Sequence, residues 1–70
     1  MPLAMARPSD GDLLIRKING KDDTIKHLAD MGFVAGQKVT VITEIAGNLI
    51  VRVKDTRIAL DKSLAQRIMV

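Results

Sequence analysis

Two stretches in the second half of the chain alternate apolar and polar residues with a period of two, which is typical of half-buried β-strands. They span residues 38–45 and 49–54. The residues predicted to face the core from these strands are Val39, Val41, Thr43, Ile45, Leu49, Val51 and Val53. The same alternation leaves Ile42 and Ile50 on the opposite face, away from the predicted core.

The connection between these two strands decides whether their apolar sets share a face. A two-residue turn at Gly47 and Asn48 would put the two sets on opposite faces. A three-residue loop of Ala46, Gly47 and Asn48 pairs Ile45 with Leu49 and aligns the sets. We therefore predict the three-residue loop, with Asn48 in the left-handed conformation that asparagine tolerates.

A short amphipathic helix is predicted over residues 22–31. Asp22 is a favourable N-cap residue, and a carboxylate in the first turn suits the helix dipole. The buried face consists of Ile25, Leu28 and Ala29. Gly32 then suits the left-handed position after the helix, and Phe33 would contact Leu28. A type II turn over 34–37 leads into the following strand.

A strand over residues 12–18 precedes the helix. Its apolar residues step by three from Ile15 to Ile18, which breaks the period of two. We therefore expect a bulge or a sharp bend at Arg16 and Lys17.

Three short elements complete the chain: a strand over 57–60, a single helical turn over 62–66 capped by Asp61, and a strand over 67–70. The predicted order is β-α-β-β-β-turn-β. Five short strands in 70 residues close most economically as a small barrel. The pattern predicts a mainly β fold with one short helix, forming a single domain over 1–70.

Composition excludes several classes of function. The chain has no cysteine, and Phe33 is its only aromatic residue. These absences exclude disulfide frameworks and thiolate chemistry, and they argue against polyproline grooves and base-stacking platforms.

A chain this small needs most of its aliphatic residues for the core, so we expect neither a deep substrate pocket nor an enzyme. The net charge of +3 is scattered, and no leader or membrane segment is recognisable, which predicts a cytoplasmic location.

Two patterns could carry chemistry. Asp23, His27 and Asp30 are spaced to share one face of the predicted helix, where they resemble a weak site for a divalent metal. The alternative is a solvated polar face. Arg52 or Arg57 could serve as an arginine finger for a partner GTPase, or could be an ordinary exposed strand arginine.

The outward face of the two alternating strands is a candidate partner surface. Ile42 and Ile50 lie near each other on it, and Lys38, Arg52 and Lys54 surround them. An apolar centre with a charged rim is typical of a small interface. Alternatively, residues 1–6 could cover the two isoleucines and make them part of the core.

The sequence resembles the FeoA family, the small cytosolic component of bacterial ferrous-iron transport. The most specific part is Leu28, Gly32, Phe33 and Gly36 in an L-x-x-x-G-[aromatic or Leu]-x-x-G pattern. The resemblance extends over positions 11, 15–18, 28–41, 50–53, 57–60, 65, 68 and 70. The chain departs from the family at Ala35, where proline is usual, and at 55–56, where glycine is frequent. The resemblance implies an SH3-like barrel that associates with the large membrane ferrous-iron transporter FeoB, which carries a cytosolic GTPase domain.

We therefore expect a non-enzymatic accessory protein of ferrous-iron uptake that needs no cofactor and acts by protein contact. The candidate partner-binding residues are Ile42, Ile50, Arg52 and Lys54, together with Met31 and Phe33 beside the helix end. The alternatives are a small basic barrel that binds nucleic acid and a weak metallochaperone that uses the helix cluster. We expect no specific nucleic acid and no direct membrane insertion. Association with the transporter would bring the protein to the inner membrane.

Overall fold

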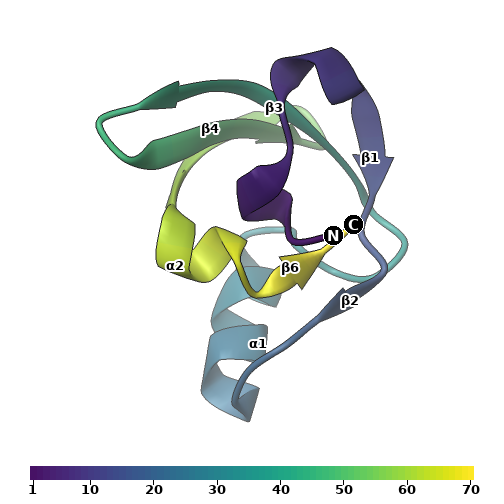
Figure 1. Ribbon diagram of the computed structural model, residues 1–70. Coiled ribbons are helices and arrows are strands. Elements are labelled where there is room, and N and C mark those ends of the chain that lie inside the picture. The colour runs from purple at the N-terminus through teal and green to yellow at the C-terminus, as the bar shows by residue number, and fades with distance from the viewer.

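The computed structural model describes residues 1–70 and contains two small antiparallel sheets that enclose one core (Figure 1). Two 3₁₀ turns begin the chain, η1 (Leu3–Met5) and η2 (Pro8–Asp10). The strands are β1 (Asp12–Leu14), β2 (Lys17–Ile18), β3 (Lys38–Ile45), β4 (Asn48–Val53), β5 (Thr56–Asp61) and β6 (Ile68–Met69). The helices are α1 (Asp22–Asp30) and α2 (Lys62–Ala65). None of the helices is long and apolar enough to cross a membrane.

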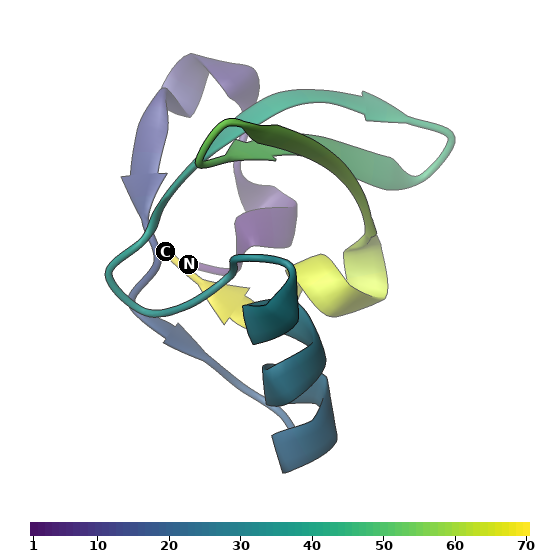
Figure 2. The same ribbon diagram turned by 180° about the vertical axis from the view of Figure 1, so that it is seen from behind.

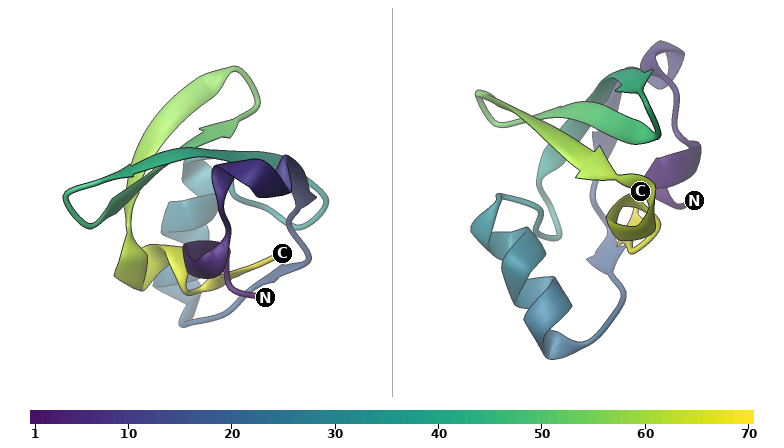
Figure 3. Two further views of the ribbon diagram at one scale, coloured as in Figure 1. Left: turned by 45° about the horizontal axis from the view of Figure 1, so that its top comes forward. Right: turned by 90° about the vertical axis from the view of Figure 1, so that its left-hand side faces the viewer.

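The larger sheet has the strand order β1-β3-β4-β5, and the smaller one pairs β2 with β6. Figures 2 and 3 show the larger sheet curving over η1, α2 and β6, with α1 at the far end of the molecule. The hydrogen-bonded ladder is not continuous around the barrel. Because neither β1 nor β5 pairs with the smaller sheet, β1 and β5 are edge strands.

The predicted first strand is divided at the place where its apolar spacing is irregular. The Ile15 amide donates to the Gln37 carbonyl at 2.9 Å, whereas the Arg16 amide donates to the Met69 carbonyl at 2.7 Å. The chain thus leaves the larger sheet and joins the smaller one between these two residues. The irregularity expected at Arg16 and Lys17 is confirmed, and its cause is a change of pairing partner.

Helix α1 ends as the sequence predicted. The Phe33 amide donates to the Leu28 carbonyl and the Gly32 amide to the Ala29 carbonyl, each at 2.9 Å. This pair of bonds is the Schellman motif, and it requires the positive φ of 101° that Gly32 adopts. Leu28 and Phe33 are fully buried side by side in the core cluster. The type II turn is also present, with the Gln37 amide donating to the Val34 carbonyl at 3.1 Å and Gly36 at φ 91°.

The predicted N-cap of this helix is wrong by one residue. Lys21 has the extended backbone of an N-cap, and its carbonyl accepts from the Ile25 amide at 3.0 Å. Asp22 is therefore already inside the helix. Asp22 and Asp23 still occupy the first turn, where a negative charge interacts favourably with the helix dipole.

The hairpin between β3 and β4 differs from the expectation. Its turn has two residues, Ala46 and Gly47, at φ 50° and 80°. Two positive φ values give the turn a twist that matches the twist of the strands, which a longer loop need not do. Ile45 consequently pairs with Asn48, and the predicted pairing of Ile45 with Leu49 is wrong.

A bulge at Ile42 compensates for the shorter turn. The register shifts between Val41 and Thr43, so that Val41 pairs with Val51 and both remain on the core face. Beyond the bulge the faces are exchanged. Thr43 and Ile45, predicted to be inward, lie on the outer face, and Ile45 is 60% exposed.

The core consists of thirteen apolar residues from every part of the chain. They are Leu3, Ala6, Ile15, Leu28, Phe33, Val39, Val41, Leu49, Val51, Val53, Leu60, Ala65 and Ile68. The N-terminal segment is part of it, since Leu3 is fully buried and Pro2 forms a bridge to Met69 of β6. Leu3 and Ala6 of the N-terminal segment therefore pack into the core, whereas Met1 and Met5 remain exposed.

Candidate functional site

Strand pairing places two rows of side chains across the outer face of the larger sheet. The first row is Asp12, Thr40, Arg52 and Arg57, and the second is Thr43, Ile50 and Ala59. These residues alternate along their strands with buried ones, so they point away from the core. We call these seven residues the outer face.

Arg52 and Arg57 are directly opposite each other in the outer face. Val53 and Thr56 flank the two-residue turn as a hydrogen-bonded pair, so the next pair, Arg52 with Arg57, is of the closer, non-hydrogen-bonded kind. The Cα atoms in such pairs are about 4.5 Å apart. The one ion pair of the protein joins Lys62 and Glu44, so neither arginine has a carboxylate partner. Two adjacent guanidinium groups without an ion-pair partner are chemically suited to contact an anionic group.

Ile50 supplies apolar surface beside these cations. It is half-buried and lies between Thr43 and Ala59 in the second row. Ile42 is also half-buried, at the bulge of β3. Both isoleucines retain exposed area, and Leu3 and Ala6 of the N-terminal segment that could have covered them are buried in the core instead.

Lys54 extends the positive charge into the turn between β4 and β5. It is exposed and adopts φ 55°, one of only two non-glycine residues with a positive φ. A side chain in this left-handed conformation costs roughly 1–2 kcal/mol relative to ordinary backbone. The turn therefore holds a lysine where glycine or asparagine would be less strained.

The two candidates beside the helix end behave differently. Met31 is half-buried, whereas Phe33 is 0% exposed inside the core. The prediction that Phe33 contacts a partner is wrong, because the Schellman ending turns its ring inward against Leu28. Only Met31 remains available near that turn.

The helix cluster is fully solvated. Asp23, His27 and Asp30 are all exposed on α1, and the Asp23 carboxylate accepts from the Thr24 amide at 2.8 Å. No group of three His, Cys, Asp or Glu side chains in the structure is placed to hold a metal ion. The shared helical face that the spacing predicts does not create a defined coordination site here.

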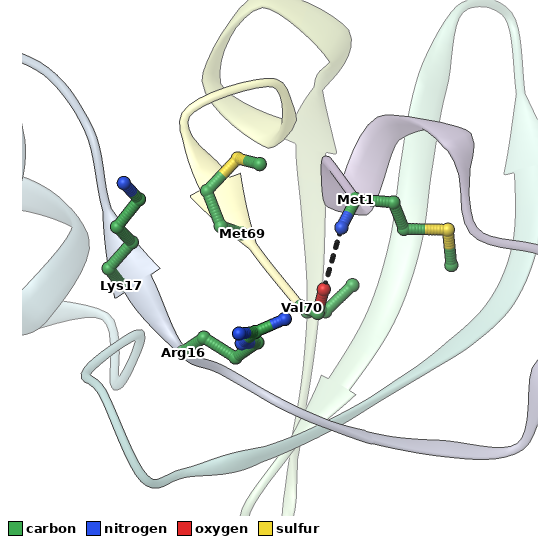
Figure 4. Close-up of a pocket in the computed structure, with 5 residues that line it drawn as sticks. All are labelled: Met1, Arg16, Lys17, Met69 and Val70. Carbon is green, nitrogen blue, oxygen red and sulfur yellow. Dashed lines mark hydrogen bonds between the residues drawn. The ribbon is translucent and has the colours of Figure 1, made fainter.

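The structure also contains an open pocket that the sequence did not indicate. Its volume is about 360 Å³, and Met1, Arg16, Lys17, Met69 and Val70 line it (Figure 4). The Met1 and Val70 backbones exchange two hydrogen bonds of 2.8 Å at its side. Three segments distant in sequence build the pocket, so only the neighbouring charges of Arg16 and Lys17 could have hinted at it.

Asp61 caps α2, as predicted, and is also the last residue of β5, which was predicted to end at residue 60. Its carboxylate accepts from the Ser63 hydroxyl at 2.6 Å and from the Leu64 amide at 2.9 Å. These two bonds favour the charged form and hold the pKa of Asp61 below its ordinary value. The negative charge of Asp61 is therefore stabilised at the N-terminal end of α2.

Comparison with known proteins identifies the family. The sequence matches the family model described as the FeoA domain over residues 1–70. The chain belongs to the FeoA family. A relative from Methanocaldococcus jannaschii is named as an Fe(2+) transport protein A. It is 33% identical over 69 residues, which is 99% of this chain and 83% of the relative.

Two crystal structures of FeoA proteins share the fold. One, an iron uptake regulatory protein, has a TM-score of 0.84 at 31% identity and covers 96% of this chain and 88% of its own. The other is the zinc complex of FeoA from Stenotrophomonas maltophilia, described as a prokaryotic SH3 domain protein. It has a TM-score of 0.82 at 25% identity and covers 99% of this chain and 87% of its own. The predicted FeoA resemblance and the SH3-like, mainly β fold are confirmed, and they connect the chain to ferrous-iron transport.

Proposed function

We propose that this protein is a non-enzymatic accessory factor of ferrous-iron uptake that binds the cytosolic region of the membrane transporter FeoB through its outer face. Membership of the FeoA family over the whole chain supports the role in iron transport. The unpaired Arg52 and Arg57 beside the half-buried Ile50 support the choice of surface. In this proposal iron is the cargo of the transporter, and the FeoA chain acts by contact from the cytoplasm.

The composition of the outer face suits a contact of this kind. Ile50 provides an apolar centre, and the cations around it provide a polar rim. The arginines can form charge-assisted, two-pronged hydrogen bonds with carboxylates on the partner. The aliphatic residues of β4 that face inward are fully used by the core, so the alternate positions are free to serve a partner.

The variant Ile50→Glu tests this surface. A carboxylate at the centre of the contact would have to be desolvated, so we expect binding to the cytosolic region of the transporter to weaken by about tenfold or more. Isothermal titration calorimetry measures the affinity, and a thermal melt confirms folding. Val34→Glu is the matched control, because Val34 is an exposed apolar residue in the 34–37 turn, outside the outer face. Unchanged binding by folded Ile50→Glu, or an equal loss in both variants, would contradict the proposed surface.

Arg52→Ala separates two roles of the arginine. A role in the rim predicts a modest loss of affinity and a proportionate loss of any effect on the transporter. An arginine finger predicts normal affinity with a large loss of stimulated GTP hydrolysis, because the finger acts in the transition state. Measurement of binding and hydrolysis on the same samples distinguishes these outcomes.

A further inference from the structure

Strand β5 has one hydrogen-bonding edge without a partner. It pairs with β4 and ends the larger sheet. Because Val53 and Thr56 form the hydrogen-bonded pair at the turn, Thr56, Ile58 and Leu60 direct their backbone groups toward β4. The alternate residues Arg57 and Ala59 direct theirs outward. No bond outside the strand ladder involves the backbone groups of these two residues, and both residues are exposed.

Such an edge is a template for a further strand. Proteins usually protect long edges with charged side chains, proline, a bulge or a covering element, and the charged residues of β5 are Arg57 and Asp61. β5 has six residues and contains neither proline nor a bulge. Its free N–H and C=O groups could pair with an extended segment of another chain.

The side chains of β5 determine which segment would fit. On the outer face, Arg57 ends a row that includes Arg52. The carboxylate of this row, Asp12, is at its other end, accepts a hydrogen bond from the Thr40 hydroxyl and forms no ion pair with either arginine. An acidic residue on an added strand would lie beside Arg57 and neutralise part of this charge. On the inner face, Ile58 is still half-exposed at the edge, so an apolar residue of the added strand would cover it.

We propose that β5 receives an extended segment of alternating acidic and apolar residues as an additional strand of the sheet. The acidic side chains pair with Arg57 and Arg52, the apolar ones cover Ile58, and the Arg57 and Ala59 backbone groups supply the hydrogen bonds. The inference rests on the proposed function only for the identity of the partner. It adds the conformation and chemistry of the partner segment that the FeoA chain recognises.

A blocked peptide of alternating Glu and Val, about as long as β5, tests the edge directly. Amide NMR of the whole protein should show saturable shifts along β5 and slower hydrogen exchange at the Arg57 and Ala59 amides. The matched control is the peptide with Lys in place of Glu, which should not bind because it would meet the two arginines. Shifts confined to another part of the protein, equal binding of both peptides, or no saturable change would overturn the proposal.

Two variants probe the backbone and the charge separately. Ala59→Pro removes an outward N–H that β4 does not use, so it should abolish peptide binding and leave the β4–β5 ladder in place. Ala59→Thr keeps that N–H and should bind like the parent. Arg57→Glu should weaken binding of the Glu peptide at least tenfold and raise the melting temperature, because it replaces a repulsive pair with an attractive one. If Ala59→Pro does not fold, Arg57→Glu still decides the question, and unchanged affinity in it would refute the proposal.

A second experiment replaces the peptide with the cytosolic region of the transporter. Binding that protects the Arg57 and Ala59 amides and is lost in Arg57→Glu supports both proposals. Binding that Ile50→Glu abolishes, without protection of those amides, refutes the added strand and leaves the proposed function standing. Peptide binding at β5 without transporter binding supports the edge site and refutes FeoB as the partner.

Discussion

The inner and outer faces of the larger sheet belong to the same strands and have opposite properties. The inner face of β4 contributes Leu49, Val51 and Val53, which are at most 2% exposed. The outer face of the same strand carries the half-buried Ile50 and the exposed Arg52, which faces Arg57 across the ladder. The inner face therefore stabilises the fold, whereas the outer face contains an arrangement that works against stability.

Like charges directly opposite each other in a sheet are destabilising. A lysine with a positive φ, as at Lys54, is destabilising as well. Both features lie in the β4–β5 hairpin. Neither feature contributes to the core, and this difference between the faces is one reason why we propose the outer face as the partner surface.

Alanine substitutions at two neighbouring residues of β4, one on each face, should give the largest difference in the free energy of unfolding. Leu49→Ala removes a buried side chain and should lower the free energy of unfolding by about 2–5 kcal/mol. That is a large part of the roughly 4–10 kcal/mol expected for a chain of this size. Ile50→Ala should cost clearly less, because Ile50 is only half-buried. Urea denaturation of both variants checks this, and equal losses would show that the two faces are equally important for the core.

Lys54→Gly should separate strain from charge in the hairpin turn. Glycine relieves the left-handed backbone, so we expect a gain in the free energy of unfolding of up to about 1 kcal/mol. Lys54→Ala is the control, because it removes the charge and keeps the strain. Both variants should bind the transporter more weakly than the parent. Greater stability of the alanine variant than of the glycine variant would contradict the assigned conformation.

Asp61, at the end of β5, should make the folding stability of the protein depend on pH. The two bonds from Ser63 and Leu64 lower the pKa of Asp61 in the folded state below its unfolded value. The stabilisation is therefore complete above the unfolded pKa of about 3.9 and is lost as the pH falls through the folded value. The melting temperature of Asp61→Asn should therefore change less between pH 7 and acidic pH than the melting temperature of the parent. Asp55→Asn, at an exposed aspartate whose side chain makes no hydrogen bond, should retain the parent's profile.

The Lys62–Glu44 ion pair should give the smallest effect. Its Nζ–Oε1 distance is 2.9 Å, but the side chains are 46% and 49% exposed. Exposed pairs contribute about 0–1 kcal/mol and are weakened by salt. A double-mutant cycle with Lys62→Ala and Glu44→Ala should give a coupling energy in that range that declines at high salt. A larger, salt-independent coupling would mean that this end of the sheet is more than a solvated surface.

Local chemistry in the sequence determined the helix end, one turn, one helix cap and the span of the longest strand. The Schellman ending at Gly32, the turn around Gly36 and the cap at Asp61 each depend on a few consecutive residues. The strand over 38–45 was predicted with its observed bounds, because its alternation is long and regular. The outward positions of Ile50 and Arg52 were likewise predicted from the alternation of β4, whereas Lys54, predicted in the same strand, is in the turn that follows it.

Tertiary structure alone decided which strands pair and in which register. The two-residue turn at Ala46 and Gly47 is compatible with an aligned core only because the bulge at Ile42 shifts β3 by one residue. The burial of Leu3, the division of the first strand and the open edge of β5 also arise from segments distant in sequence. Caps and turns are encoded by hydrogen bonds and φ preferences of neighbouring residues. Pairing partners of distant segments, in contrast, are selected by competition of all apolar segments for one small core.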